Sequence, residues 1–344
     1  MLAALLTVAL SVAPSARAVE PEETTATAEA SQGWRIGDSG FWVGGYVNNV
    51  LALPDGAPNS FTLTDVGVLL RYDLTPRITL FNETDLEDSL SWVDGDGVTV
   101  GTRVLLLERL YMDWQPRPDV TLRLGKFLTP FGLWNVVRRA PLTWTVEAPL
   151  ISEGFFPERI TGAGAGFQTT VQEWTVDATG YGQSTHELYR GASDTTASAA
   201  GGGRISAGHT FGRFYLEVGS SGVGFDNSDN QRWQYAVGSD FACTGLGNYL
   251  QAEFTYGWTT GLPDQWGLYV QDALPLPVPF IDELWGVARY EHFEPMRGPT
   301  LNGAVLGLAW RPLPWLFLKA DYQLSNVESD DFDRGFLGGI VVFF

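Results

Sequence analysis

Apolar and polar side chains alternate in segments of about ten residues along most of this 344-residue chain. From residue 250 to 258 every second residue is apolar, and Glu253 lies among the polar residues between them. In the segment 316–323, Lys319 and Asp321 share one side of the alternation, and apolar residues occupy the other. Successive side chains of an extended strand point to opposite faces. The pattern therefore predicts strands with one apolar and one polar face.

About sixteen such segments follow one another, joined alternately by short turns and by longer polar links. We expect them near 40–53, 60–73, 75–86, 101–114, 118–127, 160–171, 173–182, 202–211, 212–224, 232–243, 247–259, 264–274, 280–293, 300–311, 314–326 and 333–344. Short turns at one end and long loops at the other are typical of an outer-membrane barrel. An even number near sixteen leaves a water-filled interior.

A water-soluble β-sandwich would also alternate, with its polar face outside. Aromatic residues near the segment ends distinguish the two folds, because amphipathic rings collect at both membrane interfaces of a barrel. Such rings occur at Trp114, Trp233, Trp258, Trp266 and Trp310. We therefore predict an all-β fold, a transmembrane antiparallel β-barrel spanning residues 34–344.

The N-terminus has the pattern of an export signal. An apolar stretch at 2–13 is followed by Ala16-Arg17-Ala18, a small-x-small cleavage pattern. No Lys or Arg precedes the stretch, and a buried N-terminal helix is the alternative. We expect a signal peptide at 1–18, a disordered lead-in at 19–33 and location in a Gram-negative outer membrane. A lipoprotein is excluded, because the single cysteine is Cys243.

Composition excludes several classes of protein. The net charge of −19 argues against a nucleic-acid partner. One cysteine allows no intramolecular disulfide and no Cys-based zinc site. The chain is too short for the 22 strands and plug of a TonB-type transporter. We expect no cofactor and no metal, although the acidic stretch at 94–97 resembles part of a calcium loop.

Two stretches resemble a known family. Residues 123–135 contain Gly-Lys-Phe-Leu-Thr-Pro-Phe-Gly, which is similar to a segment of the phosphate-selective O/P porins and related barrels. The segments 287–291, 306–312 and 319–322 resemble the C-terminal part of the same group. The resemblance implies a sixteen-stranded channel, usually a homotrimer, whose third loop folds into the pore. The terminal Phe344 resembles the signal that the barrel assembly machinery reads.

The longest connection, 128–159, is rich in proline and aromatic residues. A long loop of this kind is usually functional, and we expect it to fold into the lumen and narrow the pore. Its charged residues sum to zero: Arg138, Arg139 and Arg159 against Glu147, Glu153 and Glu158. The adjacent Arg138 and Arg139 are candidates for an anion-selecting constriction. The alternative is an ion pair with a wall acid such as Glu83 or Asp85.

The lumen-facing positions mix both signs of charge. They are Arg71, Glu83, Asp85, Arg123, Asp177, Arg213, Glu217, Asp240, Glu253, Arg289, Glu291, Lys319 and Asp321. Rings of side-chain charge set ion preference in a pore. This neutral-to-acidic lumen favours weak or cation-leaning selectivity, so phosphate specificity is not carried over. The alternative for each residue is a cross-strand pair on a solvated wall.

We therefore predict a porin for passive diffusion of small ions and hydrophilic solutes, in contact with outer-membrane lipid and lipopolysaccharide. A non-conducting barrel that serves as adhesin, structural protein or assembly partner is the second possibility. An outer-membrane hydrolase is the third, since Ser184 and His186 lie close together in the chain. No sequence feature places an acid beside them, and we expect no enzymatic activity.

Overall fold

The computed structural model describes residues 33–101, 105–152, 154–186, 195–228, 231–326 and 334–344. The expected signal peptide at 1–18 lies outside these residues, as does the lead-in up to residue 32. In the described ranges, no helix combines the length and apolar character needed to cross a membrane.

The described part of the chain forms sixteen long strands, which confirms the predicted all-β class and strand number. They are β2 (Phe41–Pro54), β3 (Ser60–Thr75), β4 (Ile78–Val93), β6 (Leu106–Arg117), β7 (Val120–Leu128), β8 (Arg159–Val171), β9 (Trp174–Gln183), β10 (Ala197–Phe211), β11 (Phe214–Asn227), β12 (Arg232–Gly245), β13 (Asn248–Thr259), β14 (Gln265–Pro275), β15 (Leu284–Glu294), β16 (Leu301–Leu313), β17 (Leu316–Ser325) and β18 (Gly335–Phe343). Shorter elements are β1 (Trp34–Arg35), β5 (Gly97–Val100), the helical turn α2 (Trp134–Val137) and the 3₁₀ turn η1 (Leu150–Ser152).

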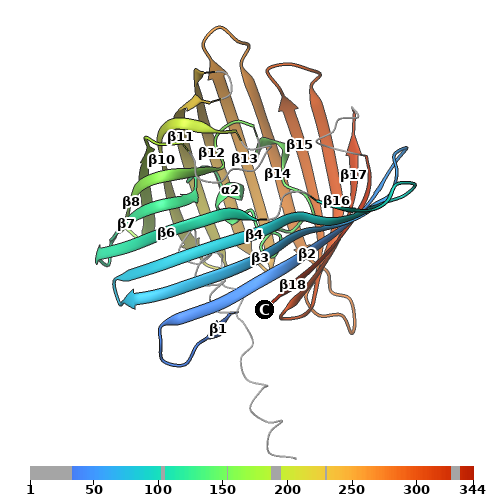
Figure 1. Ribbon diagram of the computed structural model, residues 1–344, viewed down its shortest axis with the longest axis horizontal. Helices are drawn as coiled ribbons and strands as arrows, with labels where there is room; N and C mark the ends of the chain where they lie inside the picture. Colours follow the sequence, from blue (N-terminus) through green and yellow to red (C-terminus); the bar gives the residue numbers. More distant parts are fainter. Residues whose placement is uncertain (1–32, 102–104, 153, 187–194, 229–230, 327–333) are drawn as a thin grey trace, which may run out of the picture.

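The long strands form one closed antiparallel sheet (Figure 1). Each pairs with the next long strand in sequence, and β18 returns to pair with β2, from Gly335 opposite Pro54 to Phe343 opposite Tyr46. Closure gives every long strand a partner on both sides. A barrel without free edges leaves no backbone group unpaired in hydrocarbon, which confirms the predicted transmembrane β-barrel architecture.

Tight turns connect the strands at the end of the barrel where the described termini lie. Gln172 and Glu173, between β8 and β9, both have positive φ, at 51° and 72°. Two consecutive left-handed residues form the turn type whose twist matches that of the flanking strands. One link at this end, 276–283, is longer than the others, because Pro277 and Pro279 cannot donate to a ladder.

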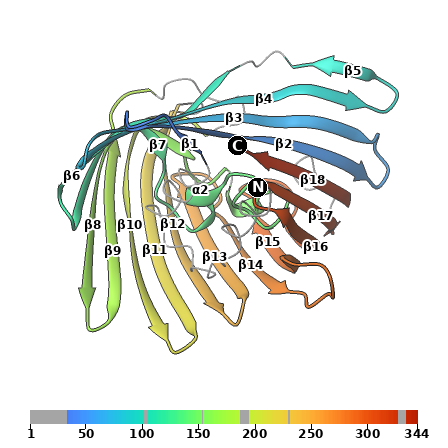
Figure 2. The same ribbon diagram turned by 90° about the horizontal axis from the view of Figure 1, so that it is seen from below.

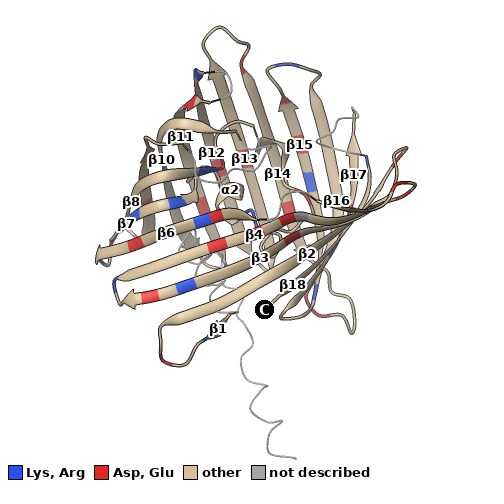
Figure 3. Ribbon diagram, in the orientation of Figure 1, with Lys and Arg blue, Asp and Glu red and all other residues tan. Residues whose placement is uncertain are grey.

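Side chains alternate between an apolar outer face and an inner face that carries the charges. On β14, Tyr269 and Gln271 are buried inside, whereas Val270 is exposed outside. Figure 3 shows both signs of charge interspersed along β3, β4, β6 and β7. The interior also holds apolar clusters, one around Phe131 and Phe155, a second around Phe317 and Val341, and a small third one of Leu301 and Val305.

Several strand bounds differ from the predicted ones. Strand β4 continues to Val93 and forms a hairpin with β5, which the sequence pattern missed. The strand expected at 280–293 begins at Leu284, because Phe280 and Glu283 adopt positive φ in the preceding link. The strand expected at 202–211 begins earlier, at Ala197.

Candidate functional site

The segment between β7 and β8 folds into the barrel, and its neck is closed by hydrogen bonds. Figure 2 shows α2 inside the ring of strands. The Thr129 N–H donates to the Glu158 carbonyl at 2.9 Å, and the Thr129 hydroxyl donates to the Pro157 carbonyl. The buried Asn135 amide donates to the carbonyls of Thr129 and Glu158, at 2.8 and 3.0 Å. Asn135 therefore ties the two ends of the segment together, a role that the sequence did not reveal.

The aromatic residues of this segment, which we call the inner loop (residues 129–158), form its packing surface. Phe131 stacks on Phe156 with ring centroids 4.2 Å apart. Phe131, Phe155 and Ile151 are buried in one cluster with wall residues that include Val223. The apolar content that predicted a packed loop therefore packs against the inner wall.

On β17, three consecutive inward side chains bind the inner loop. The Lys319 ammonium donates at 2.8 Å to each of three oxygens, the carbonyls of Ala140 and Thr145 and the hydroxyl of Thr143. The Asp321 carboxylate accepts from the Val146 N–H at 2.6 Å. Two positions further on, Gln323 donates to the Glu147 carboxylate at 2.9 Å. Lys319 and Asp321 therefore both bind backbone atoms of the inner loop.

On β15, a buried ion pair has the same role. The Arg289 guanidinium donates to the Thr145 hydroxyl at 2.6 Å and to the Glu147 carbonyl at 2.9 Å. Its Nε bonds Glu291 at 2.6 Å, and Glu291 accepts from the Leu150 N–H at 2.7 Å. A buried ion pair needs hydrogen bonds beyond its own to offset desolvation, and the loop backbone supplies them here.

On β13, Glu253 holds the start of α2. Its carboxylate accepts from the Trp134 N–H at 2.7 Å and from the Tyr269 hydroxyl at 2.6 Å. The preceding Gly132 has φ +65° and donates its N–H to the Ser221 hydroxyl at 3.1 Å. The wall from β11 to β17 therefore forms a clamp for the inner loop, made of Ser221, Glu253, Arg289, Glu291, Lys319, Asp321 and Gln323.

Both arginines proposed for the constriction are held in ion pairs. Arg139 pairs with Glu83, which also accepts from Arg109 Nε at 2.6 Å. Arg138 pairs with Glu158 at 2.5 Å, within the loop neck. Arg139 is buried, and the Arg138 side chain retains 21% exposure. The geometry matches the ion-pair alternative for Arg139, and it leaves Arg138 as the more accessible loop cation.

The remaining predicted wall charges form local contacts. Arg71 pairs with Asp73 at 2.9 Å. Arg123 grips Asp113 with two bonds, at 2.8 and 2.9 Å. Asp85 accepts from the Tyr46 hydroxyl at 2.9 Å.

The pairs on β3, β6 and β7 keep part of their surface open. The Arg71 and Asp73 side chains are 24% and 33% exposed, and those of Arg123 and Asp113 are 19% and 20% exposed. These pairs lie on the part of the wall outside the clamp.

Three predictions need separate comment. Arg213 is wrong as a wall charge, because it lies exposed in the two-residue turn formed by Gly212 and Arg213. The arginine on this wall is Arg204, which bonds Asp240 at 2.7 Å and Glu217 at 3.2 Å. The alternating pattern continues one residue beyond the N-terminal end of β11, and it therefore predicted that Arg213 lies on a strand. Glu153 lies outside the described residues, and Glu147 is exposed at the loop surface.

The chain terminus packs where the barrel closes. The Phe344 N–H donates to the Gly45 carbonyl at 2.9 Å, and the Gly45 N–H donates to the Phe344 carbonyl at 2.8 Å. A Cβ on Gly45 would lie 2.6 Å from the Phe344 ring. The terminal ring therefore covers a position on β2 that has no side chain.

Residues 94–96 of the acidic stretch form the turn of the β4–β5 hairpin, and Gly97 begins β5. Within the described ranges, no group of three or more His, Cys, Asp or Glu side chains is placed to hold a metal ion.

No protein-family model and no curated protein sequence matches the chain. Solved structures match its fold. The Salmonella typhi OmpF complex with daunomycin is 11% identical, with a TM-score of 0.59 over 90% of this chain and 100% of that chain. The anion-selective porin from Comamonas acidovorans is 12% identical, with a TM-score of 0.57 over 88% of this chain and 98% of that chain. OmpT of Vibrio cholerae is 12% identical, with a TM-score of 0.57 over 90% of this chain and 99% of that chain. This chain therefore has the closed sixteen-stranded β-barrel fold of outer-membrane porins.

Proposed function

We propose that this chain is an outer-membrane diffusion channel for small ions and hydrophilic solutes, with the inner loop as its constriction. The observation that carries the proposal is the asymmetry of the lumen. The clamp holds the loop against the wall from β11 to β17, while the ion pairs on β3, β6 and β7 keep exposed surface. A solute path along the partly exposed ion pairs uses the wall that the clamp leaves free.

We propose weak ion selectivity for this path, because its charges occur as pairs of opposite sign. Arg71 with Asp73 and Arg123 with Asp113 each sum to zero. A ring of one sign would be needed for strong preference. Residues 123–135 resemble a segment of the phosphate-selective porins, and we propose that this chain is related to that group. We do not propose phosphate specificity.

Planar bilayers test this function. We expect stepwise conductance and, in a salt gradient, a reversal potential close to zero. Liposome swelling should decline with increasing solute size. A protein that inserts as a heat-modifiable barrel but gives neither current nor swelling would contradict the proposal.

A non-conducting barrel is the second candidate, and the apolar clusters in the lumen favour it. Phe131 and Phe155 fill one part of the interior, and Phe317 and Val341 fill another. The inner loop also reaches the opposite wall through Arg139 and Glu83. Absence of current in the unmodified protein, together with current in a variant whose clamp is broken, would select this candidate.

We also propose an oligomeric state and binding partners for this chain. OmpT of Vibrio cholerae is described in a trimer form, and we propose a homotrimer here, testable by light scattering in detergent. We propose contact with lipopolysaccharide at the long-loop end and recognition of Phe344 by the assembly machinery. We propose that the chain has no hydrolytic activity. Ester or peptide turnover that His186→Ala abolishes would contradict this.

A further inference from the structure

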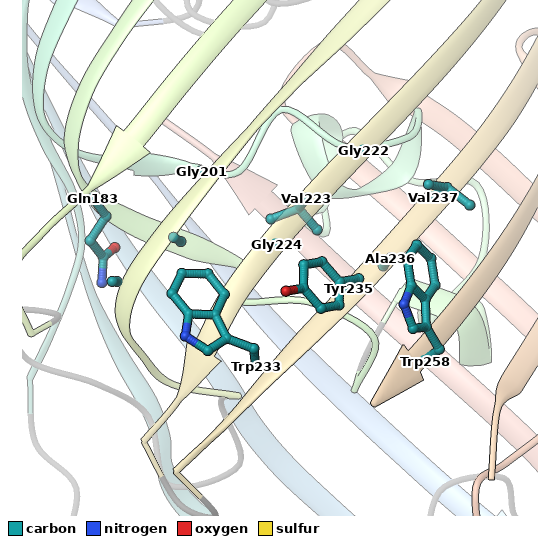
Figure 4. A pocket seen from close by; sticks show the side chains of 12 residues that line it. Gln183, Gly201, Gly222, Val223, Gly224, Trp233, Tyr235, Ala236, Val237 and Trp258 are labelled. Atoms are coloured by element: carbon teal, nitrogen blue, oxygen red, sulfur yellow. The ribbon is translucent and has the colours of Figure 1, made fainter. Parts of the chain in front are cut away.

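A hollow of about 620 Å³ lies on the outer face of the barrel, over β10 to β13 (Figure 4). Trp233, Tyr235 and Val237 line it and are exposed, whereas Val223 and Ala236, which also line it, are buried. The alternation places the hollow on the side away from the lumen. We call it the outer groove, and none of its lining residues belongs to the inner loop or to the clamp.

Glycines form the floor of the outer groove. Gly201 is paired with Gly224, and Gly222 with Val237, so the three glycines lie on the outer face. A Cβ on Gly201 would meet no atom closer than 3.8 Å, and one on Gly222 would meet none closer than 4.0 Å. Glycine inside a strand is destabilising relative to alanine. Packing within the barrel does not require glycine at positions 201 and 222. The uncovered floor of the groove therefore indicates contact with a molecule outside the chain.

The wall of the outer groove is aromatic and rigid. Tyr235 stacks on Trp258, with centroids 5.4 Å apart and planes at 19°. Trp233 lies against Tyr235, with centroids 6.4 Å apart and planes at 26°. None of the twelve lining residues is Asp, Glu, Lys or Arg. An uncharged cleft with a flat aromatic side suits an apolar occupant.

We propose that the outer groove binds one acyl chain of a membrane lipid. The outer face of an outer-membrane barrel meets hydrocarbon, and the groove is continuous with that face. An unfilled void there would forfeit dispersion contacts on every lining atom. A flexible chain can adopt the shape of the groove, whereas a second protein copy would need a ridge that matches it. The proposal does not depend on channel activity.

Photolabelling tests the proposal in the folded protein. The probe is a phosphatidylcholine with a diazirine midway along one acyl chain, added to vesicles of phosphatidylethanolamine that contain the protein. We expect label at residues 233–237 and at Trp258 to be severalfold denser than at Leu306 or Ile340. Both comparison residues are exposed on the outer face, on β16 and β18.

A double variant fills the groove. Gly201→Leu with Gly222→Leu should lower the label at Trp258 to the level found at Leu306. Gly338→Leu is the matched control, because Gly338 lies on the outer face of β18 and its Cβ would make ordinary contacts, at 3.5 Å or more. The control should leave the label in the groove unchanged.

Three outcomes would overturn the proposal. They are equal labelling of the groove and of Leu306 in the unmodified protein, labelling that the filled variant does not reduce, and cross-links from residues 233–237 to a second copy. The first needs no variant, so it stands even if the filled protein fails to fold. None of these outcomes is a conductance measurement. A protein that conducts ions but shows no preferential labelling of the groove would overturn this proposal and leave the proposed channel function standing.

Discussion

Gly132 and Glu253 are so close that any side chain at residue 132 would displace the Glu253 carboxylate. A Cβ on Gly132 would lie 1.9 Å from Oε2 of Glu253. The glycine also has φ +65°, a conformation that L side chains rarely adopt. Steric and backbone requirements therefore coincide at the position where the loop turns toward α2.

Gly132→Ala should destabilise the barrel by about 1–3 kcal/mol from backbone strain alone. Displacement of Glu253 from the Trp134 N–H adds the cost of an unmade buried hydrogen bond. Gly154→Ala is the control, because Gly154 also has positive φ, at +79°, and its Cβ would meet nothing within 4 Å. Urea unfolding in detergent micelles measures both. Equal losses would show that the contact with Glu253 carries no energy.

Lys319→Met should release the central part of the inner loop. Three oxygen acceptors would lose a charged donor, and a buried acceptor left without a hydrogen bond costs about 1–3 kcal/mol. We expect faster thermolysin cleavage between residues 140 and 150 and a larger single-channel conductance. Arg117→Met is the control, because Arg117 pairs with Asp119 and its side chain is 71% exposed. Such surface pairs contribute about 0–1 kcal/mol. Matching cleavage rates in the two variants would exclude the clamp.

Glu83→Gln should shift ion preference toward anions. The substitution removes one negative charge from a site that also holds Arg109 and Arg139, so the local charge rises by one. Reversal potentials in a potassium chloride gradient give the sign directly. Asp119→Asn, in an exposed turn pair with Arg117, should leave the potential unchanged.

Arg138→Ala with Arg139→Ala should shift preference toward cations, since it removes two positive charges from the inner loop. Arg138 is the more exposed of the two and should account for most of the change. A conductance and reversal potential equal to those of the unmodified channel would show that the pair does not lie at the constriction.

Phe344→Ala should reduce the yield of folded barrel in the outer membrane. The ring lies at the Gly45 position and near Trp34, with centroids 6.2 Å apart, so its loss opens a gap at the closure of the barrel. Ile340→Ala is the control, because Ile340 is exposed on the outer face of β18, the strand that precedes Phe344. Heat-modifiable mobility of the membrane fraction measures both, and similar yields would exclude a special role for the terminal residue.

Alternation, together with the aromatic residues near the segment ends, predicted the barrel, because both are local properties of the sequence. A strand with one apolar and one polar face needs hydrocarbon or a core on one side and water on the other, whatever its partners are. Strand number and the loop that enters the lumen followed from the segment lengths and from the aromatic content of residues 128–159. Turn chemistry was less well predicted, as Arg213 and the late start of β15 show.

Only the tertiary structure determines which groups the charged side chains of the inner wall bind. Sequence placed Lys319, Asp321, Arg289 and Glu253 on inward faces, where a role in the pore and a role in packing look the same. Lys319 meets the Thr145 carbonyl from 174 residues away, and this contact exists only because strand register and barrel closure bring β17 to the loop. A periodic pattern determines the face on which a side chain lies, whereas the group it meets across a closed sheet depends on every strand between them.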